Sequence, residues 1–493
     1  MSTHARSSQL PKLSRRSIVA STAWAVPAIM AATATPAYAA SSPALAVAIS
    51  TPQMQSPAAG DAKATATVAD ASGRAAAGSA VSFMGPSGVS FSPATTTTND
   101  AGIATTTMTT TNAWATPGSS ITATALSGGN SGSAAITQLG ANALVSGSGS
   151  VTNGTTTTWT PTQLPLVFPS PVTALVSNRQ AAYALLEDGT VWSVGSNGYG
   201  QLGDGTKTDR STWAVISSLS DVRQIAAFSG GAYALLGSGS IRSWGMNNLG
   251  QLGNGNTTQS SSPTVVSGIT AAVAVAGGND NGYALLRDGS VVSWGFNYYG
   301  QIGNGTVGRD SSTWAVTRPV AVGLDNKADS IVAGGTSAYA LLKDTTVRAW
   351  GDNRSGQLGN NSSAEYSSTI VVVGNLSGMK QIAGGGKSAY ALSKDGQVFA
   401  WGSDSSGALG TGKGNSPKPV RMLSGASSLS AGAASGYALR SDGTLSVWGS
   451  NYQGQLGDGT TTDRATPVTV TPPVSVSKLM TSSPTSMTQF LVH

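Results

Sequence analysis

The chain has 493 residues and no cysteine, so disulfide bonds and thiolate chemistry are excluded. Its two histidines, His4 and His493, lie close to the two ends, and neither a Ser-His-Asp triad nor a His/Cys zinc site can be built from them. Charged residues make up only 10% of the sequence and form no runs of one sign. We therefore expect no enzyme activity, no cofactor and no metal site, and a fold held together by packing alone.

Residues 1–39 have the composition of an export signal. They carry four basic residues and no acidic one, followed by an Ala-rich apolar stretch and a small-x-small site at 37–39. This order predicts a signal peptide that is cleaved after Ala39. The stretch around Arg15-Arg16 resembles the twin-arginine export motif, with two departures from its usual Phe and Lys. A retained transmembrane helix is the alternative, which a proline inside the apolar stretch disfavours.

Export changes the meaning of the charge. The full chain has 27 basic and 21 acidic residues, a formal net charge of +6 at pH 7. Four of the basic residues lie in the predicted signal peptide, and the remainder nearly balances the acidic residues. A basic surface of the kind that binds nucleic acid is therefore not expected. We predict an extracellular or cell-wall associated monomer, with no stable membrane insertion after cleavage.

Residues 42–139 are rich in Ala, Thr, Ser and Gly and lack the motif that repeats further along the chain. Their alternating apolar residues predict strands at 45–49, 64–68, 80–84, 89–91, 103–109, 121–125 and 134–137. Seven short strands in a segment of this size indicate an antiparallel β-sandwich. The stretches 70–83 and 99–104 resemble the bacterial Ig-like module of invasin and intimin type. That resemblance implies a spacer or an adhesive stalk.

From about residue 141 to the end, a segment close to Tyr-Ala-Leu-Leu-x-Asp-Gly-x-Val-x-x-Trp-Gly-x-Asn-x-x-Gly-Gln-Leu-Gly recurs. Its anchor aromatics, spaced 47 to 56 residues apart, are Tyr183, Tyr233, Tyr283, Tyr339, Tyr390, Tyr437 and Phe490. Each unit has the pattern of short strands separated by an Asp-Gly hairpin and a Gly-rich bend, without a helical period. Four-stranded units of this length, arranged radially, make a β-propeller.

The two ends of the repeat array predict a closed ring of seven blades. The last unit stops at Val492, before its hairpin turn and its Trp-Gly strand. Upstream of the first full unit, residues 143–147, 153–155 and 160–161 resemble the second half of a repeat. We expect the two halves to pair in one composite blade, because such closure removes exposed sheet edges. The predicted fold is all-β, with a sandwich followed by a seven-bladed propeller over residues 141–493.

The motif Trp-Gly-x-Asn-x-x-Gly-Gln-Leu-Gly resembles the regulator-of-chromosome-condensation repeat. It occurs at 244–253, 294–303 (with Ile for Leu), 350–359 and 448–457. Two blades depart from it, with Val194 in place of Trp and Ala408 in place of Gln. The resemblance implies a seven-bladed propeller. The nuclear founder of the family is a guanine-nucleotide exchange factor, an activity that the predicted export disfavours.

The bend between the Asn of the motif and its Gly-Gln is variable, and it carries Tyr199, Tyr298, Tyr299 and Tyr452. Sister blades have Asn, Leu, Arg or Ser in this bend, so the framework does not require tyrosine there. Rigid aromatic side chains on a rim suit contacts with protein or glycan, because they give large contact area at little entropic cost. Packing under neighbouring loops is the alternative.

Trp213 and Trp314 lie in near-identical Ser-Thr-Trp-Ala-Val stretches, where other blades have a proline such as Pro263 or Pro467. Both tryptophans are candidates for loop contacts with a partner. Packing against an outer strand is the alternative, in keeping with the usual burial of tryptophan.

These observations predict an exported bacterial binding protein in which the sandwich is a spacer and the propeller contacts an extracellular protein or a cell-surface glycan. A second hypothesis is a secreted inhibitor, because a β-lactamase-inhibiting propeller has similar Tyr-Ala-Leu and Val-x-x-Trp-Gly units. Nucleotide exchange and action on polysaccharides are the enzymatic alternatives.

Overall fold

The computed structural model describes residues 46–50, 60–70, 72–85, 89–110, 120–127, 130–137, 143–147, 158–163, 168–170, 172–178, 180–310, 313–471, 478–479 and 489–492. The predicted signal peptide with its cleavage site, and the segment 153–155, lie outside these residues. The chain divides into two compact units, residues 1–141 with 165–169, and residues 142–164 with 170–493. Nearly all of the regular structure in the described residues is β-strand, as the sequence predicts.

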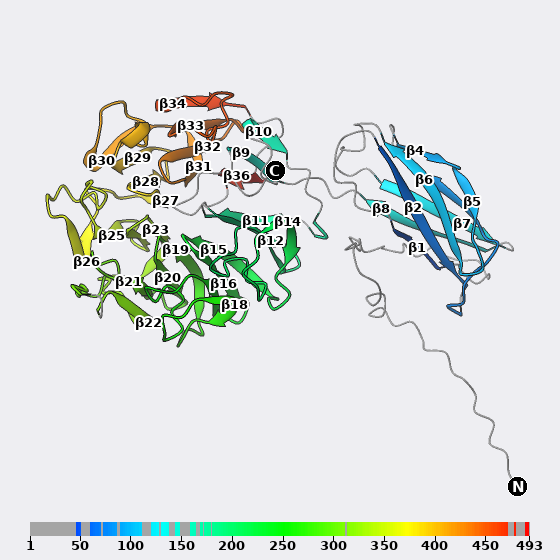
Figure 1. The fold of residues 1–493 in the computed structure, drawn as a ribbon. Coiled ribbons are helices and arrows are strands. Elements are labelled where there is room, and N and C mark those ends of the chain that lie inside the picture. The colour runs from blue at the N-terminus through cyan, green and yellow to red at the C-terminus, as the bar shows by residue number, and fades with distance from the viewer. Residues whose placement is uncertain are drawn as a thin grey trace, which may run out of the picture. The chain divides into compact units, whose positions relative to one another are not determined.

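The first unit consists of two four-stranded antiparallel sheets (Figure 1). The two strand orders are β1-β2-β6-β4 and β5-β3-β7-β8. Their core contains Val68, Val81 and Ala123, all fully buried. Phe83 and Phe91, one from each sheet, stack with ring centroids 5.8 Å apart. The strands are β1 (Ala46–Ser50), β2 (Gly60–Ala69), β3 (Ala80–Met84), β4 (Val89–Ser92), β5 (Thr95–Thr97), β6 (Ile103–Thr110), β7 (Ser120–Ser127) and β8 (Asn130–Thr137).

All seven segments predicted as strands in this unit are strands, and sequence reasoning missed an eighth, β5. This strand is three threonines long, so it has neither an apolar alternation nor enough length to be recognised. Its pairing with β3 gives the second sheet its fourth strand.

The second unit contains six successive four-stranded sheets, here called blades 1 to 6, each built from strands that pair in chain order. Figure 1 shows them arranged around a common axis. The strands are, in blade 1, β11 (Val172–Ser177), β12 (Ala181–Leu186), β13 (Val191–Gly195) and β14 (Arg210–Val215); in blade 2, β15 (Val222–Phe228), β16 (Gly231–Leu236), β17 (Ile241–Gly245) and β18 (Ser260–Val265); in blade 3, β19 (Ala272–Gly277), β20 (Asn281–Leu286), β21 (Val291–Phe296) and β22 (Ala315–Ala321); in blade 4, β23 (Ala328–Ala333), β24 (Ser337–Leu342), β25 (Val347–Asp352) and β26 (Tyr366–Val372); in blade 5, β27 (Met379–Gly384), β28 (Ser388–Ser393), β29 (Val398–Gly402) and β30 (Ser416–Leu423); and in blade 6, β31 (Ala426–Ala431), β32 (Ser435–Arg440), β33 (Leu445–Gly449) and β34 (Arg464–Val470).

A seventh sheet combines strands from both ends of this unit, in the order β10-β9-β36-β35. Its strands are β9 (Ala143–Gly147), β10 (Thr158–Gln163), β35 (Lys478–Leu479) and β36 (Gln489–Val492). The antiparallel register of β36 on β9 places Leu491 opposite Leu144. Blade 6 contacts this sheet through β31 and β35, and blade 1 contacts it through β11 and β36.

The first strands of the six blades line a pocket of about 100 Å³, and most of the lining residues are Val, Ile, Ala and Gly. In the first strand of blade 2, the Gln224 side chain donates to the carbonyl oxygen of Val275 and accepts from its N–H, both at 3.0 Å. Gln381 makes the same pair of hydrogen bonds with Leu429 between blades 5 and 6, at 2.7 and 2.9 Å. These amides act as backbone mimics that connect neighbouring blades at the axis.

No helix in the described part of the chain is long and apolar enough to cross a membrane.

Candidate interaction surface

The tryptophan and the glutamine backbone of the repeat motif connect one blade to the next. The backbone oxygen of Gln301, in the bend of blade 3, accepts two hydrogen bonds: from the Tyr283 hydroxyl of the same blade at 3.1 Å, and from Trp350 Nε1 of blade 4 at 2.9 Å. The two rings meet edge to face, with centroids 6.1 Å apart. We call this arrangement the latch. Equivalent bonds from tyrosine hydroxyls and tryptophan Nε1 atoms occur at Gln201, Gln251, Gln357 and Ala408.

The latch explains why blade 5 tolerates Ala408 in place of glutamine. The acceptor is a backbone carbonyl, so Trp448 Nε1 still donates to Ala408 at 3.0 Å. In the other blades the glutamine side chain has a separate task. The Oε1 atom of Gln301, for example, accepts the N–H of Tyr299 at 2.8 Å and so fixes the tight bend.

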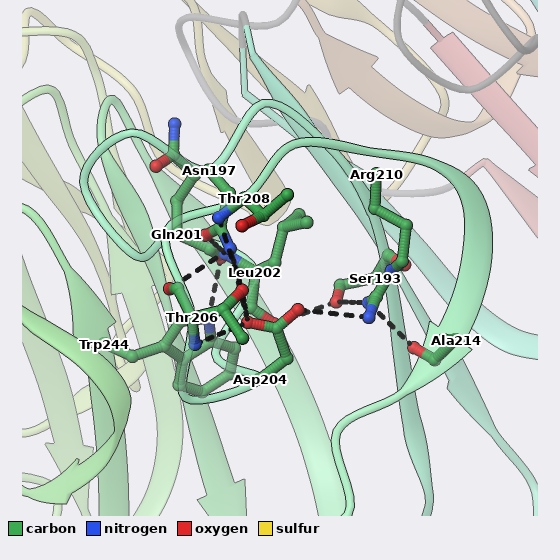
Figure 2. Close-up of polar contacts among 10 residues, drawn as sticks. All are labelled: Ser193, Asn197, Gln201, Leu202, Asp204, Thr206, Thr208, Arg210, Ala214 and Trp244. Atoms are coloured by element: carbon green, nitrogen blue, oxygen red, sulfur yellow. Dashed lines mark hydrogen bonds and ion pairs between the residues drawn. The ribbon is translucent and has the colours of Figure 1, made fainter.

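The Gly-Asp-Gly-Thr loop of blade 1 is a second framework element (Figure 2). The carboxylate of Asp204 accepts hydrogen bonds from the N–H and hydroxyl of Thr206, at 2.9 and 2.8 Å, and from Arg210 at 3.1 Å. Burial acts to raise the pKa of Asp204, but these bonds and the charge of Arg210 outweigh it and leave the pKa below its usual value. Asp458 and Arg464 repeat the arrangement in blade 6. These aspartates are therefore structural.

The framework residues are engaged in these bonds. The blades differ in the side chains of the bend between the motif asparagine and its Gly-Gln pair. Tyr199 of blade 1 and Tyr452 of blade 6 are exposed, with 41% and 55% of their surface accessible. Tyr298 and Tyr299 of blade 3 are only half-buried. The structure places Tyr199 and Tyr452 on the two blades that contact the seventh sheet, and thus away from the blade 3 pair.

Four aromatic side chains of blade 3 form a contiguous cluster, here called the aromatic patch: Phe296, Tyr298, Tyr299 and Trp314. Tyr298 is at its centre. Its ring is parallel to Phe296 within 7° and perpendicular to Trp314, with centroids 6.3 and 6.0 Å away. Tyr299 meets Tyr298 edge to face at 4.8 Å. The patch therefore combines three residues predicted as site residues, Tyr298, Tyr299 and Trp314.

An arginine of the next blade extends the patch. The guanidinium of Arg354 lies 4.1 Å from the ring centroid of Tyr299, a cation–π distance. It also makes a two-point contact with the buried carboxylate of Asp352, at 2.9 Å for each bond. Burial acts to raise the pKa of Asp352, but the hydrogen bonds from Arg354 hold it below its usual value. The same bonds raise the pKa of Arg354. Arg354 is thus fixed in place beside the aromatic rings.

The two tryptophans predicted to be equivalent are not equivalent in the structure. In blade 1, Trp213 directly precedes Ala214, which pairs with Ser193 of the third strand. Pro263 occupies the equivalent position in the outer strand of blade 2. In blade 3 that place belongs to Pro319, and Trp314 precedes the start of the outer strand. The expectation that Trp314 replaces a proline is therefore wrong. The pairing of β21 with β22 contains a β-bulge, which sets the position of each residue in the outer strand. The similarity of the two Ser-Thr-Trp-Ala-Val stretches does not reveal this bulge.

Sequence reasoning missed Phe296 and Arg354 as members of this surface. A signal for both was available. Phe296 follows the Trp-Gly pair, where two other blades have serine, and Arg354 occupies the bend position that Tyr298 occupies in blade 3. The proximity of Arg354 to Tyr299 depends on how blades 3 and 4 are placed side by side.

Comparison with known families identifies the repeat. The family model "Regulator of chromosome condensation (RCC1) repeat" matches residues 188–235, 238–285, 288–341, 395–439 and 442–483. A second model of the same repeat matches residues 172–201, 272–301, 379–408 and 426–455. Together the two models match more than half of the chain. The chain belongs to the RCC1 repeat family, which confirms the resemblance seen in the sequence.

Relatives and solved structures agree on the fold. The chain is 39% identical over 101 residues to the human probable E3 ubiquitin-protein ligase HERC6, and 33% identical over 92 residues to the human Regulator of chromosome condensation. These matches cover 19% and 18% of the chain, and only 10% and 22% of the relatives. Prp20p of Saccharomyces cerevisiae has a TM-score of 0.61 at 22% identity, over 71% of this chain and 90% of Prp20p. Human WBSCR16 has a TM-score of 0.59 at 24% identity, over 68% and 88%. At these identities the likeness shows the propeller fold alone.

Proposed function

We propose that this chain is an exported bacterial binding protein whose propeller contacts a partner protein through the aromatic patch of blade 3 and the adjoining Arg354. The observation that carries the proposal is the patch itself: four aromatic rings at variable positions, joined into one cluster through Tyr298, with an arginine held over Tyr299. Tyrosine, tryptophan and arginine are the residues most enriched among binding hot spots.

The framework supports the same conclusion. The motif tyrosine, tryptophan and glutamine are engaged in the latch, and the Asp-Gly-Thr loops in internal hydrogen bonds. The bend rings do not take part in either. The structure of Prp20p was described together with its binding to Gsp1p and histones, so a propeller of this fold serves as a protein-binding platform in at least that protein. For this chain we propose protein binding in general, and not the partners of Prp20p.

A site-specific crosslink tests the proposal. A photoreactive phenylalanine analogue placed at Tyr299 in the exported chain is expected to trap a partner protein from the extracellular fraction. The same analogue at Val265, which is 49% exposed on blade 2, is the control. A protein trapped from residue 299 and not from residue 265 supports the patch. Equal trapping at both positions, or none at either, contradicts it.

Export is the second part of the proposal, and it rests on the order of charge, apolar stretch and Ala-Tyr-Ala site in the sequence. The mature chain is expected outside the cytoplasm with Ala40 as its first residue, as read by N-terminal sequencing. Replacing Arg15 and Arg16 with lysine should stop export by the twin-arginine route. Processing of that variant at the normal rate would contradict the route.

We also propose that the seventh sheet closes the ring and that the sandwich of the first unit is an Ig-like spacer. Closure is supported by the pairing of β36 with β9, and by the contacts of this sheet with both blade 6 and blade 1. The spacer role is supported by the two-sheet architecture of the first unit.

A further inference from the structure

The outer strands of the blades carry a recurring device that blocks strand addition. In blade 2, Ser243 at the centre of the third strand pairs with Thr264 of the outer strand, and the residue directly before Thr264 is Pro263. Five of the seven sheets of this unit have a proline at the equivalent position of the outer strand: Pro161, Pro263, Pro319, Pro419 and Pro467. An edge strand presents unpaired N–H and C=O groups, and a proline removes one of the donors.

Blade 4 lacks this protection. Its outer strand β26 has Ile370 at the proline position, directly before Val371, which pairs with Ala349. The strand sequence Tyr-Ser-Ser-Thr-Ile-Val-Val also contains no charged residue. Among the outer strands that the structure describes, β26 alone has neither a proline nor a charge, since β14 of blade 1, the other strand without proline, begins with Arg210.

The direction of the free groups follows from the ladder. The N–H of Val373 donates inward to the carbonyl of Val347 at 3.1 Å. Backbone groups alternate in direction along a regular strand, so the N–H and C=O of Val372 point away from β25. Ile370 directly precedes Val371, at the β-bulge between Ser367 and Val371. The Val372 side chain is 54% exposed, whereas Ile370 packs on the core shared by blades 3 and 4.

The free edge of β26 lies next to the bend of blade 3 that carries Tyr298 and Tyr299. In the bend of blade 3, Gly300 follows Tyr299 directly, and it packs so closely on β26 that a Cβ there would lie 2.5 Å from the Cα of Ser368. The N–H of Gly305 donates to the carbonyl of Ser368 at 2.9 Å. The bend of blade 3 thus covers the first half of β26 and leaves the second half open.

We propose that a short extended segment of the partner protein adds to β26 as a fifth strand of blade 4, paired with Ile370 and Val372, while the aromatic patch holds its flanking side chains. This inference rests on the proposed function and names the form of the partner. The covered first half of β26 leaves room for a short segment and not for the full edge of a second propeller. The uncharged strand and the exposed Val372 fit a segment with an aliphatic residue facing that valine.

The probe is a display library of short random linear peptides, selected on the purified mature chain. Enriched peptides are expected to show alternating aliphatic residues and to bind through their backbones. N-methylation of alternate residues that removes the paired N–H groups should weaken binding about tenfold, the effect of losing two hydrogen bonds, whereas N-methylation of the intervening residues should have little effect.

Variants of the chain separate the edge from the patch. Ile370→Pro restores the residue type of the sister blades, so it should fold, and Val372→Lys adds an edge charge. Both should weaken peptide binding about tenfold, and Val265→Lys, at the equivalent exposed position of blade 2, should not. Tyr298→Ala with Tyr299→Ala tests the patch by itself.

If the tyrosine variant loses binding while Ile370→Pro and Val372→Lys match Val265→Lys, strand addition is wrong and the proposed function stands. If the edge variants lose binding and the tyrosine variant does not, strand addition stands without the patch, and the proposed function is wrong. Loss of binding in both sets supports both. Self-association of the chain that Val372→Lys abolishes would show a second copy at this edge and overturn the inference, as would a library without enriched peptides.

Discussion

At the scale of single residues, the repeat is a set of shape requirements around the motif tryptophan that each of blades 2 to 6 carries. The glycine that ends the Gln-Leu-Gly triplet has a positive φ and lies directly against the tryptophan of the next blade. In blade 3 this residue is Gly303, with φ +71°, and a Cβ on it would lie 2.7 Å from Trp350 Cδ1. The sequence pattern therefore records contacts between blades as well as turns within them.

Gly303→Ala should destabilise the propeller by roughly 2 to 4 kcal/mol, because left-handed backbone strain adds to a clash in a packed core. Gly305→Ala is the matched control. Gly305 also has a positive φ, +86°, but a Cβ on it would meet no atom within 4 Å. The control should therefore cost only about 1 to 2 kcal/mol of backbone strain. Chemical denaturation of both variants gives the two free energies of unfolding, and equal losses would show that the Trp350 contact does not matter.

At the scale of strands and hairpins, the sequence predicted most of the second unit. Each anchor aromatic lies in the second strand of its sheet, from Tyr183 in β12 to Phe490 in β36. The hairpin positions have the positive φ that Asp-Gly implies, and Thr345 adopts φ 69° where five blades have glycine. Period and turn chemistry are local properties, so a single sequence reveals them.

The candidate site was less predictable. The bend tyrosines were found because they break the repeat, but the sequence did not show that Tyr298 and Tyr299 join Trp314 while Tyr199 and Tyr452 lie on other blades. That grouping depends on two features of blade 3. Its repeat is six residues longer than that of blades 1 and 2, and the first residue of β22, Ala315, pairs with Phe296. The contact of Arg354 with Tyr299 joins two blades through bend residues that vary from blade to blade, so it leaves no periodic signal.

The composite sheet makes a prediction about register. A chain without cysteine allows a clean crosslink, and the pairing of Leu491 with Leu144 predicts that Leu144→Cys with Leu491→Cys forms a disulfide under mild oxidation. Leu144→Cys with Phe490→Cys should crosslink poorly, because adjacent residues point to opposite faces of a sheet. Mass spectrometry of the oxidised variants distinguishes them. Equal crosslinking would contradict the register.

Closure predicts the effect of removing the last strand. Deleting residues 487–493 takes away β36 and leaves β9 paired with β10 alone, so the whole propeller should melt at a lower temperature. An unchanged melting temperature would show that the ring does not depend on this sheet.

At the scale of the whole molecule, the latches make stability sensitive to alkaline pH. Burial raises the pKa of the latch tyrosines, to about 12 for Tyr390, and it also raises the pKa values of Tyr183, Tyr233, Tyr283 and Tyr339. The pKa of Tyr437, whose hydroxyl donates to the backbone oxygen of Gln455, is raised for the same reason. In the unfolded chain a tyrosine loses its proton near pH 10. The folded pKa is higher, so this contribution to stability is complete below pH 10 and is lost as the pH rises through the folded pKa.

We therefore expect the propeller to unfold between about pH 10 and pH 12, with tyrosinate absorbance of the latch residues rising together with the loss of β-sheet circular dichroism. Tyr390→Phe supplies the control. It should be less stable than the natural chain at neutral pH by about 1 kcal/mol, because the hydroxyl bond to Ala408 is lost. Its deficit should shrink above pH 10. A deficit that stays constant would contradict the titration of the buried tyrosines.

The blades supply a rigid framework, and we propose that the aromatic patch supplies binding. The most direct test is to measure, for Tyr298→Ala with Tyr299→Ala, both the melting temperature and the affinity for the protein trapped from residue 299. We expect a loss of binding free energy of about 2 kcal/mol or more, with a melting temperature close to that of the natural chain. Unchanged affinity, or a loss of affinity matched by a loss of stability, would contradict this division between framework and binding surface.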